Sequence, residues 1–307
     1  MGRCAHRDGV SCGYRRSDGF QLRRCRVDEQ LRQLAHETLI AVFLEERCCV
    51  EARHVQIMTD TALADLASRI ASARRVTAMT GAGVSAASGV PTFRGPDGLW
   101  RHYRPEDLAT PVAFARDPSL VWEWYAWRRE RVAACHPNAA HDVLARWSQH
   151  DGFRLITQNV DDLHGRAGTR DLVRLHGSLW ELKCFNVCAK GALPWRDERV
   201  PLPELPPLCP HCGGQARPAV VWFGESLDGA DVDRAFEATT CDVFLTIGTS
   251  AVVYPAAGFV HEARARGAFT AEINTEATPA SSRVDLSLLG PAEEILPSIE
   301  RLLANVR

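Results

Sequence analysis

The chain has 307 residues, of which 46% are hydrophobic and 24% are charged, and its formal net charge is −2. This length and mixture suit a globular protein of two domains, or of one large domain with an insertion. A charge near zero provides no basic field for nucleic acid or anionic membranes. The apolar run at residues 39–44 is too short to cross a bilayer, and no signal-peptide cleavage site follows it. We therefore expect a cytoplasmic protein without nucleic-acid or membrane partners.

Residues 1–57 differ from the rest of the chain because they are rich in Arg and Cys and open without a helical or strand period. A helix is predicted within them, from about residue 28 to residue 46. They are interpreted either as a regulatory or targeting extension or as the product of a mis-called translation start. We favour the second interpretation, since Met58 leads directly into an amphipathic helix with Leu63, Leu66 and Ile70 on one face.

Four short apolar runs then predict strands at residues 75–80, 153–157, 241–247 and 268–273, alternating with helical segments. This alternation predicts an α/β fold in which a Rossmann-type parallel sheet forms the large domain, from residues 58–95, 136–179 and 221–307. Each strand runs into a small or polar loop, and ligands bind at that edge of an open α/β sheet. Two segments interrupt the alternation and would form a smaller inserted lobe: residues 96–135, which are helical, and residues 180–220, which carry cysteines.

One helix of the smaller lobe has clear ends. Asp117 and Pro118 form a favourable N-cap and first turn, so a helix is expected to run to about Ala134. On it, Tyr125 and Arg128 are three residues apart and share a face.

Four of the eleven cysteines form a cluster in the second inserted segment: Cys184, Cys188, Cys209 and Cys212. An odd total without a secretion signal argues against a disulfide framework. Four thiolates at this spacing suit one tetrahedral, structural Zn²⁺ that would stabilise the small lobe. His211 is an alternative ligand, although four thiols suffice.

The first predicted strand ends at Gly81-Ala82-Gly83, which is similar to the start of a dinucleotide-binding fingerprint. The spacing argues against an ordinary dehydrogenase, because the next glycine, Gly89, comes six residues after Gly83 rather than three. Pro91 then stops any helix within two turns.

Residues 81–95, GAGVSAASGVPTFRG, closely resemble the NAD-binding signature of the sirtuins. Further sirtuin motifs follow in family order: TQNVDDLH at 157–164, LHGS at 175–178, VWFGE at 221–225, GTS at 248–250 and NTE at 274–276. The resemblance covers residues of about 60–305 and implies a sirtuin catalytic domain over residues 58–307. The chain departs from the usual sirtuin pattern in the gap between Cys184 and Cys188, which has three residues rather than two.

The resemblance implies that His176, Asn159 and Asp161 are catalytic, and that His176 activates a hydroxyl of the nicotinamide ribose. A near-neutral imidazole suits that role. Phe93 would shield the reacting ribose from water, and Arg94 would position NAD. The NAD-binding residues that the resemblance implies are Gly81, Ala82, Gly83, Ala86, Pro91, Thr92, Phe93, Arg94, Trp100, Gln158, Asn159, Asp161, Gly248, Thr249, Ser250, Asn274, Thr275, Glu276 and Ala292.

The Tyr125-x-x-Arg128 pair matches the pair by which class III sirtuins recognise acidic acyl chains, and Ala109 matches their small pocket residue. An acetyl group would leave Tyr125 and Arg128 buried and unpaired, at a cost of about 1–3 kcal/mol. The alternative is that Arg128 belongs to a solvated charged run at 128–131 and Tyr125 to tryptophan packing. We favour recognition of succinyl and malonyl groups.

We therefore expect a class III-like sirtuin, an NAD-dependent desuccinylase and demalonylase with weaker deacetylase activity. Its co-substrate would be NAD, it would hold one structural zinc ion, and its products would be nicotinamide, lysine and 2′-O-acyl-ADP-ribose. The backbone of Val221, Trp222 and Phe223 would pair with acyl-lysine proteins or peptides as an added strand. We expect a monomer. The alternatives are a deacetylase-dominant sirtuin, a mono-ADP-ribosyltransferase and a non-catalytic zinc-ribbon module.

Overall fold

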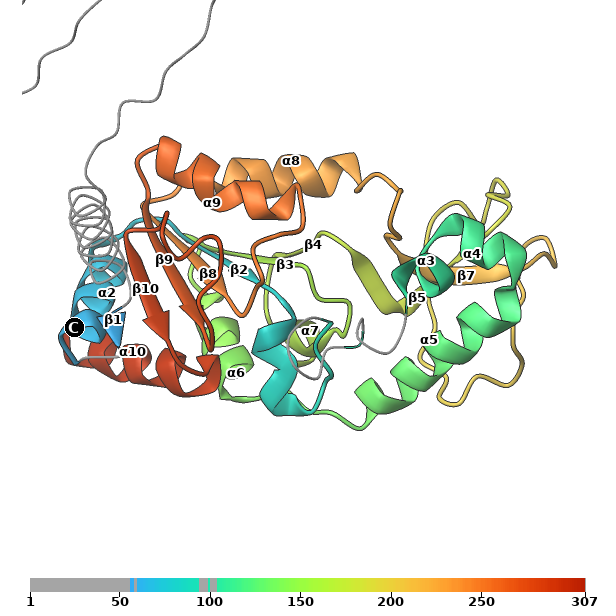
Figure 1. The fold of residues 1–307 in the computed structure, drawn as a ribbon, viewed down its shortest axis with the longest axis horizontal. Helices are drawn as coiled ribbons and strands as arrows, with labels where there is room; N and C mark the ends of the chain where they lie inside the picture. The colour runs from blue at the N-terminus through green and yellow to red at the C-terminus, as the bar shows by residue number, and fades with distance from the viewer. Residues whose placement is uncertain (1–55, 58–59, 94–98, 100–103, 307) are drawn as a thin grey trace, which may run out of the picture. The chain divides into compact units, whose positions relative to one another are not determined.

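The structure, a computed structural model, describes residues 56–57, 60–93, 99 and 104–306. Seven parallel strands of this part of the chain form one sheet in the order β1-β10-β9-β8-β2-β3-β4 (Figure 1). The strands are Gln56–Ile57 (β1), Val76–Thr80 (β2), Phe153–Thr157 (β3), Leu172–Arg174 (β4), Val243–Ile247 (β8), Phe269–Asn274 (β9) and Leu286–Leu289 (β10). The chain continues from β2 to β3 on one side and returns to β8 on the other. The loop after β2 therefore lies where the strand order reverses, the usual ligand site of such sheets.

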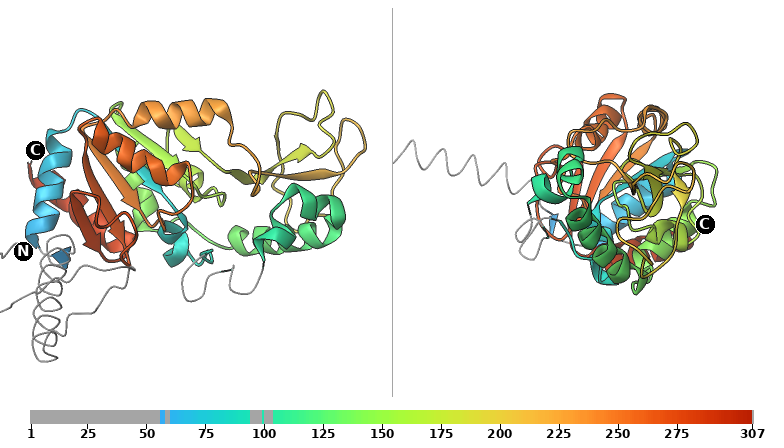
Figure 2. Two further views of the ribbon diagram at one scale, coloured as in Figure 1. Left: turned by 45° about the horizontal axis from the view of Figure 1, so that its top comes forward. Right: turned by 90° about the vertical axis from the view of Figure 1, so that its right-hand side faces the viewer.

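Helices cover both faces of this sheet (Figures 1 and 2). On one face, α10 (Ala292–Val306) packs against α2 (Asp60–Ser72) and α6 (Ala139–Trp147). On the other face lie α8 (Gly229–Ala238) and α9 (Ala256–Ala265). Successive residues of β3 divide between the two cores, with Leu155 in the first and Ile156 in the second. This arrangement confirms the predicted α/β, Rossmann-type fold.

The four strands predicted from apolar runs are β2, β3, β8 and β9, and each lies within two residues of its predicted ends. The predicted helix after Met58 is α2, with Leu63 and Leu66 buried. Gln56 and Ile57 precede the boundary expected at residue 58 and pair in parallel with β10. The helix predicted at residues 28–46, like the rest of residues 1–55, lies outside the described residues. No helix in the described part of the chain is long and apolar enough to cross a membrane.

The smaller lobe has its own apolar core beneath three helices and a second sheet. The helices are α3 (Pro105–Leu108), α4 (Pro111–Arg116) and α5 (Pro118–Ala133). The sheet is antiparallel, in the order β6 (Trp195–Arg196), β5 (Gly177–Cys184) and β7 (Ala216–Val220), and it begins three residues before the boundary expected at residue 180. The predicted N-cap is confirmed, since the Asp117 carboxylate accepts a hydrogen bond from the Leu120 amide at 3.0 Å.

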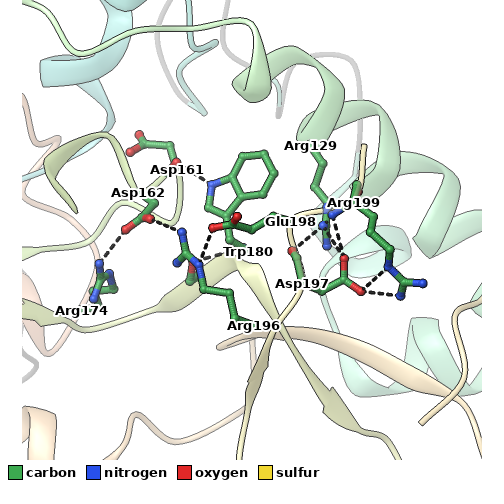
Figure 3. Close-up of polar contacts among 10 residues, drawn as sticks. Arg129, Asp161, Asp162, Arg174, Trp180, Arg196, Asp197, Glu198 and Arg199 are labelled. Carbon is green, nitrogen blue, oxygen red and sulfur yellow. Dashed lines mark hydrogen bonds and ion pairs between the residues drawn. The ribbon is translucent and has the colours of Figure 1, made fainter. Parts of the chain in front are cut away.

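Ion pairs join elements of the two lobes (Figure 3). The Asp162 carboxylate, in the loop after β3, accepts from Arg174 at the end of β4 (2.6 Å) and from Arg196 of β6 (3.0 Å). One residue further along the chain, Asp197 binds Arg129 of α5 at 3.0 Å. The loop after β3 is therefore tied both to the parallel sheet and to the small lobe.

Candidate active site

A cavity of about 640 Å³ lies at the carboxyl ends of β2, β3, β8 and β9 and extends to the small lobe. All the described residues to which the sequence analysis assigned a role in binding NAD or substrate, or in catalysis, line it, except Pro91 and Asp161. Arg94 and Trp100 lie outside the described residues. The structure thus brings together residues from motifs that span more than 200 positions of the chain.

Glycines let two cavity loops cross at close range. The Gly83 amide donates to the Gly248 carbonyl at 2.8 Å, and a methyl group at Gly83 would lie 2.8 Å from the Gly248 Cα. Gly248 has φ +60°, and a methyl group there would lie 2.4 Å from the Val84 nitrogen. Side chains at these positions would push the loops apart, so glycine is required. The chain then forms one short 3₁₀ helix, Ala82–Ser88, which ends at Gly89 in the left-handed region as predicted.

The loop after β3 is held to its neighbours by side-chain amides. The Gln158 Nε2 donates to Thr249 Oγ1 at 3.0 Å, and the Asn159 Nδ2 donates to the Gly81 carbonyl at 3.0 Å. No described residue donates to the side-chain oxygens of Gln158 and Asn159. Both oxygens are therefore available as acceptors for the hydroxyl groups of a bound ligand.

Asp161 lies behind the cavity rather than in it. Its buried carboxylate accepts from Ser85 Oγ at 2.8 Å and from the Leu163 amide at 2.9 Å, and burial raises its pKa. Its carbonyl accepts from the Trp180 Nε1 at 2.9 Å. His141, whose Nε2 is 3.3 Å from Ser85 Oγ, has its pKa lowered to about 4 by burial and is therefore neutral. Asp161 is placed to hold the loop after β3 against the Ala82–Ser88 segment.

The His176 side chain lies in the cavity wall with a defined tautomer. Its Nδ1 is 2.9 Å from the Gln158 carbonyl oxygen. Since a carbonyl only accepts, Nδ1 carries the hydrogen and Nε2 is left with a free lone pair. Burial lowers the pKa of His176, although the hydrogen bond to Gln158 opposes this shift. The ring is therefore neutral near pH 7 and can take a proton at Nε2.

A cation lies at the small-lobe end of the cavity. Arg128 is only 8% exposed, and its guanidinium carbon is 4.9 Å from the Phe93 ring centre and 4.8 Å from the Trp124 ring centre. No carboxylate of the described residues forms an ion pair with it. Burial lowers the pKa of Arg128, and the neighbouring Tyr125 opposes this shift. The interpretation of 128–131 as a solvated run is therefore wrong for Arg128, and Arg129 is buried as well.

Tyr125 combines both expected environments. Its ring packs edge-on against Trp124 at 4.8 Å, as the packing interpretation requires, and its side chain also lines the cavity beside Arg128. Its hydroxyl oxygen accepts from the Trp222 Nε1 at 2.9 Å. Ala109 lines the same end, and its carbonyl accepts from the Phe223 amide at 2.9 Å.

The backbone of residues 221–223 is already engaged within the chain. The Val221 amide donates to the His176 carbonyl, and the Trp222 amide donates to the Glu225 carboxylate. With Phe223 bound to Ala109, all three N–H groups have internal acceptors. An added substrate strand at these residues would have to bind through their carbonyl oxygens.

The four clustered cysteines fit one tetrahedral zinc ion. Their Sγ atoms all lie within 4.8 Å of one another, with Cys184 and Cys212 3.6 Å apart and Cys188 and Cys209 3.8 Å apart. Tetrahedral Zn–S bonds of about 2.3 Å require sulfur atoms about 3.8 Å apart. The three-residue gap after Cys184 is compatible with this geometry. His211 is not in the group, and its ring lies against Trp195.

The sequence analysis missed several residues of the cavity wall. Trp124 precedes Arg128 by one helical turn, a spacing that indicates a shared face and could have found it. Tyr254, at the cavity rim and 71% exposed, carries no such signal. The other lining residues not singled out are Ala87, Val160, Val220, Gly224, Glu225, Leu227, Val253, Ile273, Ala277, Thr278, Pro279, Gly290, Pro291 and Glu293.

Comparison with known proteins gives consistent matches. Residues 81–255 match the Sir2 family. The chain is 48% identical over 213 residues to the NAD-dependent protein deacylase of Aquifex aeolicus, covering 69% of this chain and 87% of that protein. It is 45% identical over 262 residues to the mitochondrial NAD-dependent protein deacylase sirtuin-5 of Canis lupus familiaris, covering 76% and 84%.

Solved structures agree with these relatives. A crystal structure of a Sir2 homologue–NAD complex aligns with a TM-score of 0.75 at 43% identity, covering 84% of this chain and 100% of that one. The structure of Sir2Af2 bound to a myristoylated histone peptide aligns with a TM-score of 0.66 at 29% identity, covering 81% and 99%.

Proposed function

Because this chain belongs to the Sir2 family and is an NAD-dependent protein deacylase with a structural zinc site, we propose that it removes succinyl and malonyl groups from lysine in preference to acetyl groups. Its substrates would be acyl-lysine proteins or peptides. The products would be nicotinamide, free lysine and 2′-O-acyl-ADP-ribose.

The observation that carries this proposal is the buried Arg128. A buried cation without a partner is costly, and a carboxylate at the end of a succinyl or malonyl chain would supply the missing charge. The Tyr125 hydroxyl lies beside it, and the small side chain of Ala109 leaves room for the longer acyl group. An acetyl group would bring no charge to Arg128, so its binding would leave that guanidinium unpaired.

The chemistry would use the residues around His176. The acyl oxygen of the substrate attacks the anomeric carbon of the nicotinamide ribose, and nicotinamide leaves. His176 Nε2 then takes the proton of a ribose hydroxyl, which attacks the acyl carbon, and water completes the release of lysine. Gln158 and Asn159 would offer their side-chain oxygens to ribose hydroxyls, and Phe93 would exclude bulk water from the reacting carbon.

The test compares one lysine peptide carrying succinyl, malonyl or acetyl, with and without NAD, by mass spectrometry. We expect succinyl to be removed fastest. In Arg128→Met, kcat/KM for the succinyl peptide should fall about 10- to 150-fold, the value of about 1.5–3 kcal/mol for hydrogen bonds to a charged group. The acetyl peptide should change less than about threefold. Arg131→Met is the matched control, because Arg131 lies on the same helix but is exposed.

Three outcomes would contradict the proposal. Faster removal of acetyl by the wild-type enzyme would indicate a deacetylase-dominant member of the family. Equal losses for succinyl and acetyl peptides in Arg128→Met would show that Arg128 does not recognise the acyl carboxylate. Retention of label from NAD on the protein substrate would indicate mono-ADP-ribosyl transfer.

A further inference from the structure

The indole of Trp222 is bonded to the side chain expected to bind the acyl carboxylate. Trp222 is 2% exposed, and its Nε1 lies 2.9 Å from the Tyr125 hydroxyl oxygen, at the cavity wall. An indole N–H only donates, so the Tyr125 oxygen is the acceptor and its own hydrogen must point elsewhere. No acceptor among the described residues lies within hydrogen-bonding distance of that hydrogen.

Trp222 is itself held from two directions. The Arg217 guanidinium carbon lies 3.4 Å from the Trp222 ring centre, and the same guanidinium binds both carboxylate oxygens of Glu225, at 2.5 Å and 2.8 Å. The Glu225 carboxylate also accepts from the Trp222 amide at 2.8 Å. Phe114 packs on the ring with centres 5.4 Å apart. The indole therefore cannot rotate away from Tyr125 without breaking buried contacts.

We propose that Trp222 is a positioning residue for acyl selection: its indole N–H occupies the Tyr125 oxygen and so directs the Tyr125 hydroxyl hydrogen toward the acyl carboxylate beside Arg128. This inference rests on the proposed preference for acidic acyl groups. Burial raises the pKa of Tyr125, so the phenol keeps its proton and remains a donor near pH 7. Because a hydrogen bond accepted at the oxygen polarises the O–H group, Trp222 also strengthens the bond that Tyr125 donates.

The test is a double-mutant cycle on Trp222→Phe and Tyr125→Phe. Trp222→Phe keeps an aromatic ring and loses the N–H, and should raise KM for the succinyl peptide about 2- to 13-fold, the range for one net hydrogen bond. The kcat, KM for NAD and KM for the acetyl peptide should stay within about twofold. Combined with Tyr125→Phe, Trp222→Phe should add no further loss, because the group it positions is already absent.

Trp122→Phe is the matched control. Its buried indole also donates one hydrogen bond, to the Ala216 carbonyl at 2.9 Å, but Trp122 does not line the cavity. It should therefore leave KM for the succinyl peptide unchanged. In ¹⁵N-tryptophan-labelled protein, the indole resonance that disappears in Trp222→Phe should shift in Tyr125→Phe.

The outcomes separate this inference from the proposed function. A wild-type preference for succinyl with an unchanged KM in Trp222→Phe overturns the role of Trp222 alone. Additive losses in the double variant, or an unshifted indole resonance in Tyr125→Phe, overturn it as well. A wild-type enzyme without a preference for succinyl overturns the proposed function and this inference together.

Discussion

The buried ion pair beside the acyl-binding residues leads to a prediction about unequal partners (Figure 3). The side chains of Arg129 and Asp197 are 2% and 4% exposed, and Arg129 Nη2 lies 3.0 Å from Asp197 Oδ1. The Asp197 carboxylate has a second cation, Arg199, whose Nε is 3.0 Å away and whose side chain is 58% exposed. Arg129 has no second carboxylate, and its Nε and Nη1 have no hydrogen-bond partner.

Removing one partner should therefore cost more than removing the other. Asp197→Asn leaves the Arg129 charge buried without a counter-charge, which should cost about 3–5 kcal/mol. Arg129→Met leaves Asp197 paired with Arg199, so its cost should be nearer the loss of buried hydrogen bonds, about 1–3 kcal/mol. Burial alone would raise the pKa of Asp197, but its bonds to Arg199 and the charge of Arg129 hold that pKa below its usual value. The stabilisation by this carboxylate is therefore present at neutral pH and is lost as the pH falls through the lowered pKa.

Thermal unfolding of the zinc-loaded protein at pH 7 measures the difference. At about 2–4 °C per kcal/mol for a domain of this size, Asp197→Asn should lower Tm by about 6–20 °C and Arg129→Met by clearly less. Asp231→Asn, which breaks the exposed pair with Arg234, is the control and should change Tm little. A larger loss in Arg129→Met than in Asp197→Asn would refute the reasoning, because it would make Asp197 the partner that depends on the pair.

Two further predictions concern the site and the zinc cluster. Because burial lowers the pKa of His176 below the usual 6.5, kcat/KM should hold at mildly acidic pH and fall only as the pH drops through that lowered pKa; an acidic limb centred above 6.5 would contradict a neutral, buried base. Metal analysis should find one zinc per chain, and Cys209→Ser should lower the zinc content and Tm together; full zinc content with an unchanged Tm would show that the buried Cys209 is not a ligand.

The order of the strands and much of the cavity wall could be predicted from local sequence. Apolar runs ending at Gly81, Gln158 and Gly248 lie on neighbouring parallel strands, and parallel strands place their carboxyl ends at one edge. Motif residues in those loops therefore had to meet. Strands as short as β4 and β10 carry too few residues for a period, so they were not predicted individually.

Which way each polar side chain faces was decided by tertiary packing. Asp161 turns from the cavity because Ser85, 76 positions earlier, offers its carboxylate a hydroxyl. Arg128 is buried although it opens a charged run, since α5 packs that face against aromatic rings of the small lobe.

By itself, the sequence determined the α/β fold, the cysteine cluster and the residues at the strand ends, because these follow from periodicity and spacing along the chain. Only the tertiary structure decided that Trp222 would donate to Tyr125, 97 positions away, and that Arg128 would lie buried without a carboxylate partner among the described residues. Local spacing sets which face of an element a residue occupies. The partner it meets there depends on how separate elements pack, and that depends on contacts between distant parts of the chain.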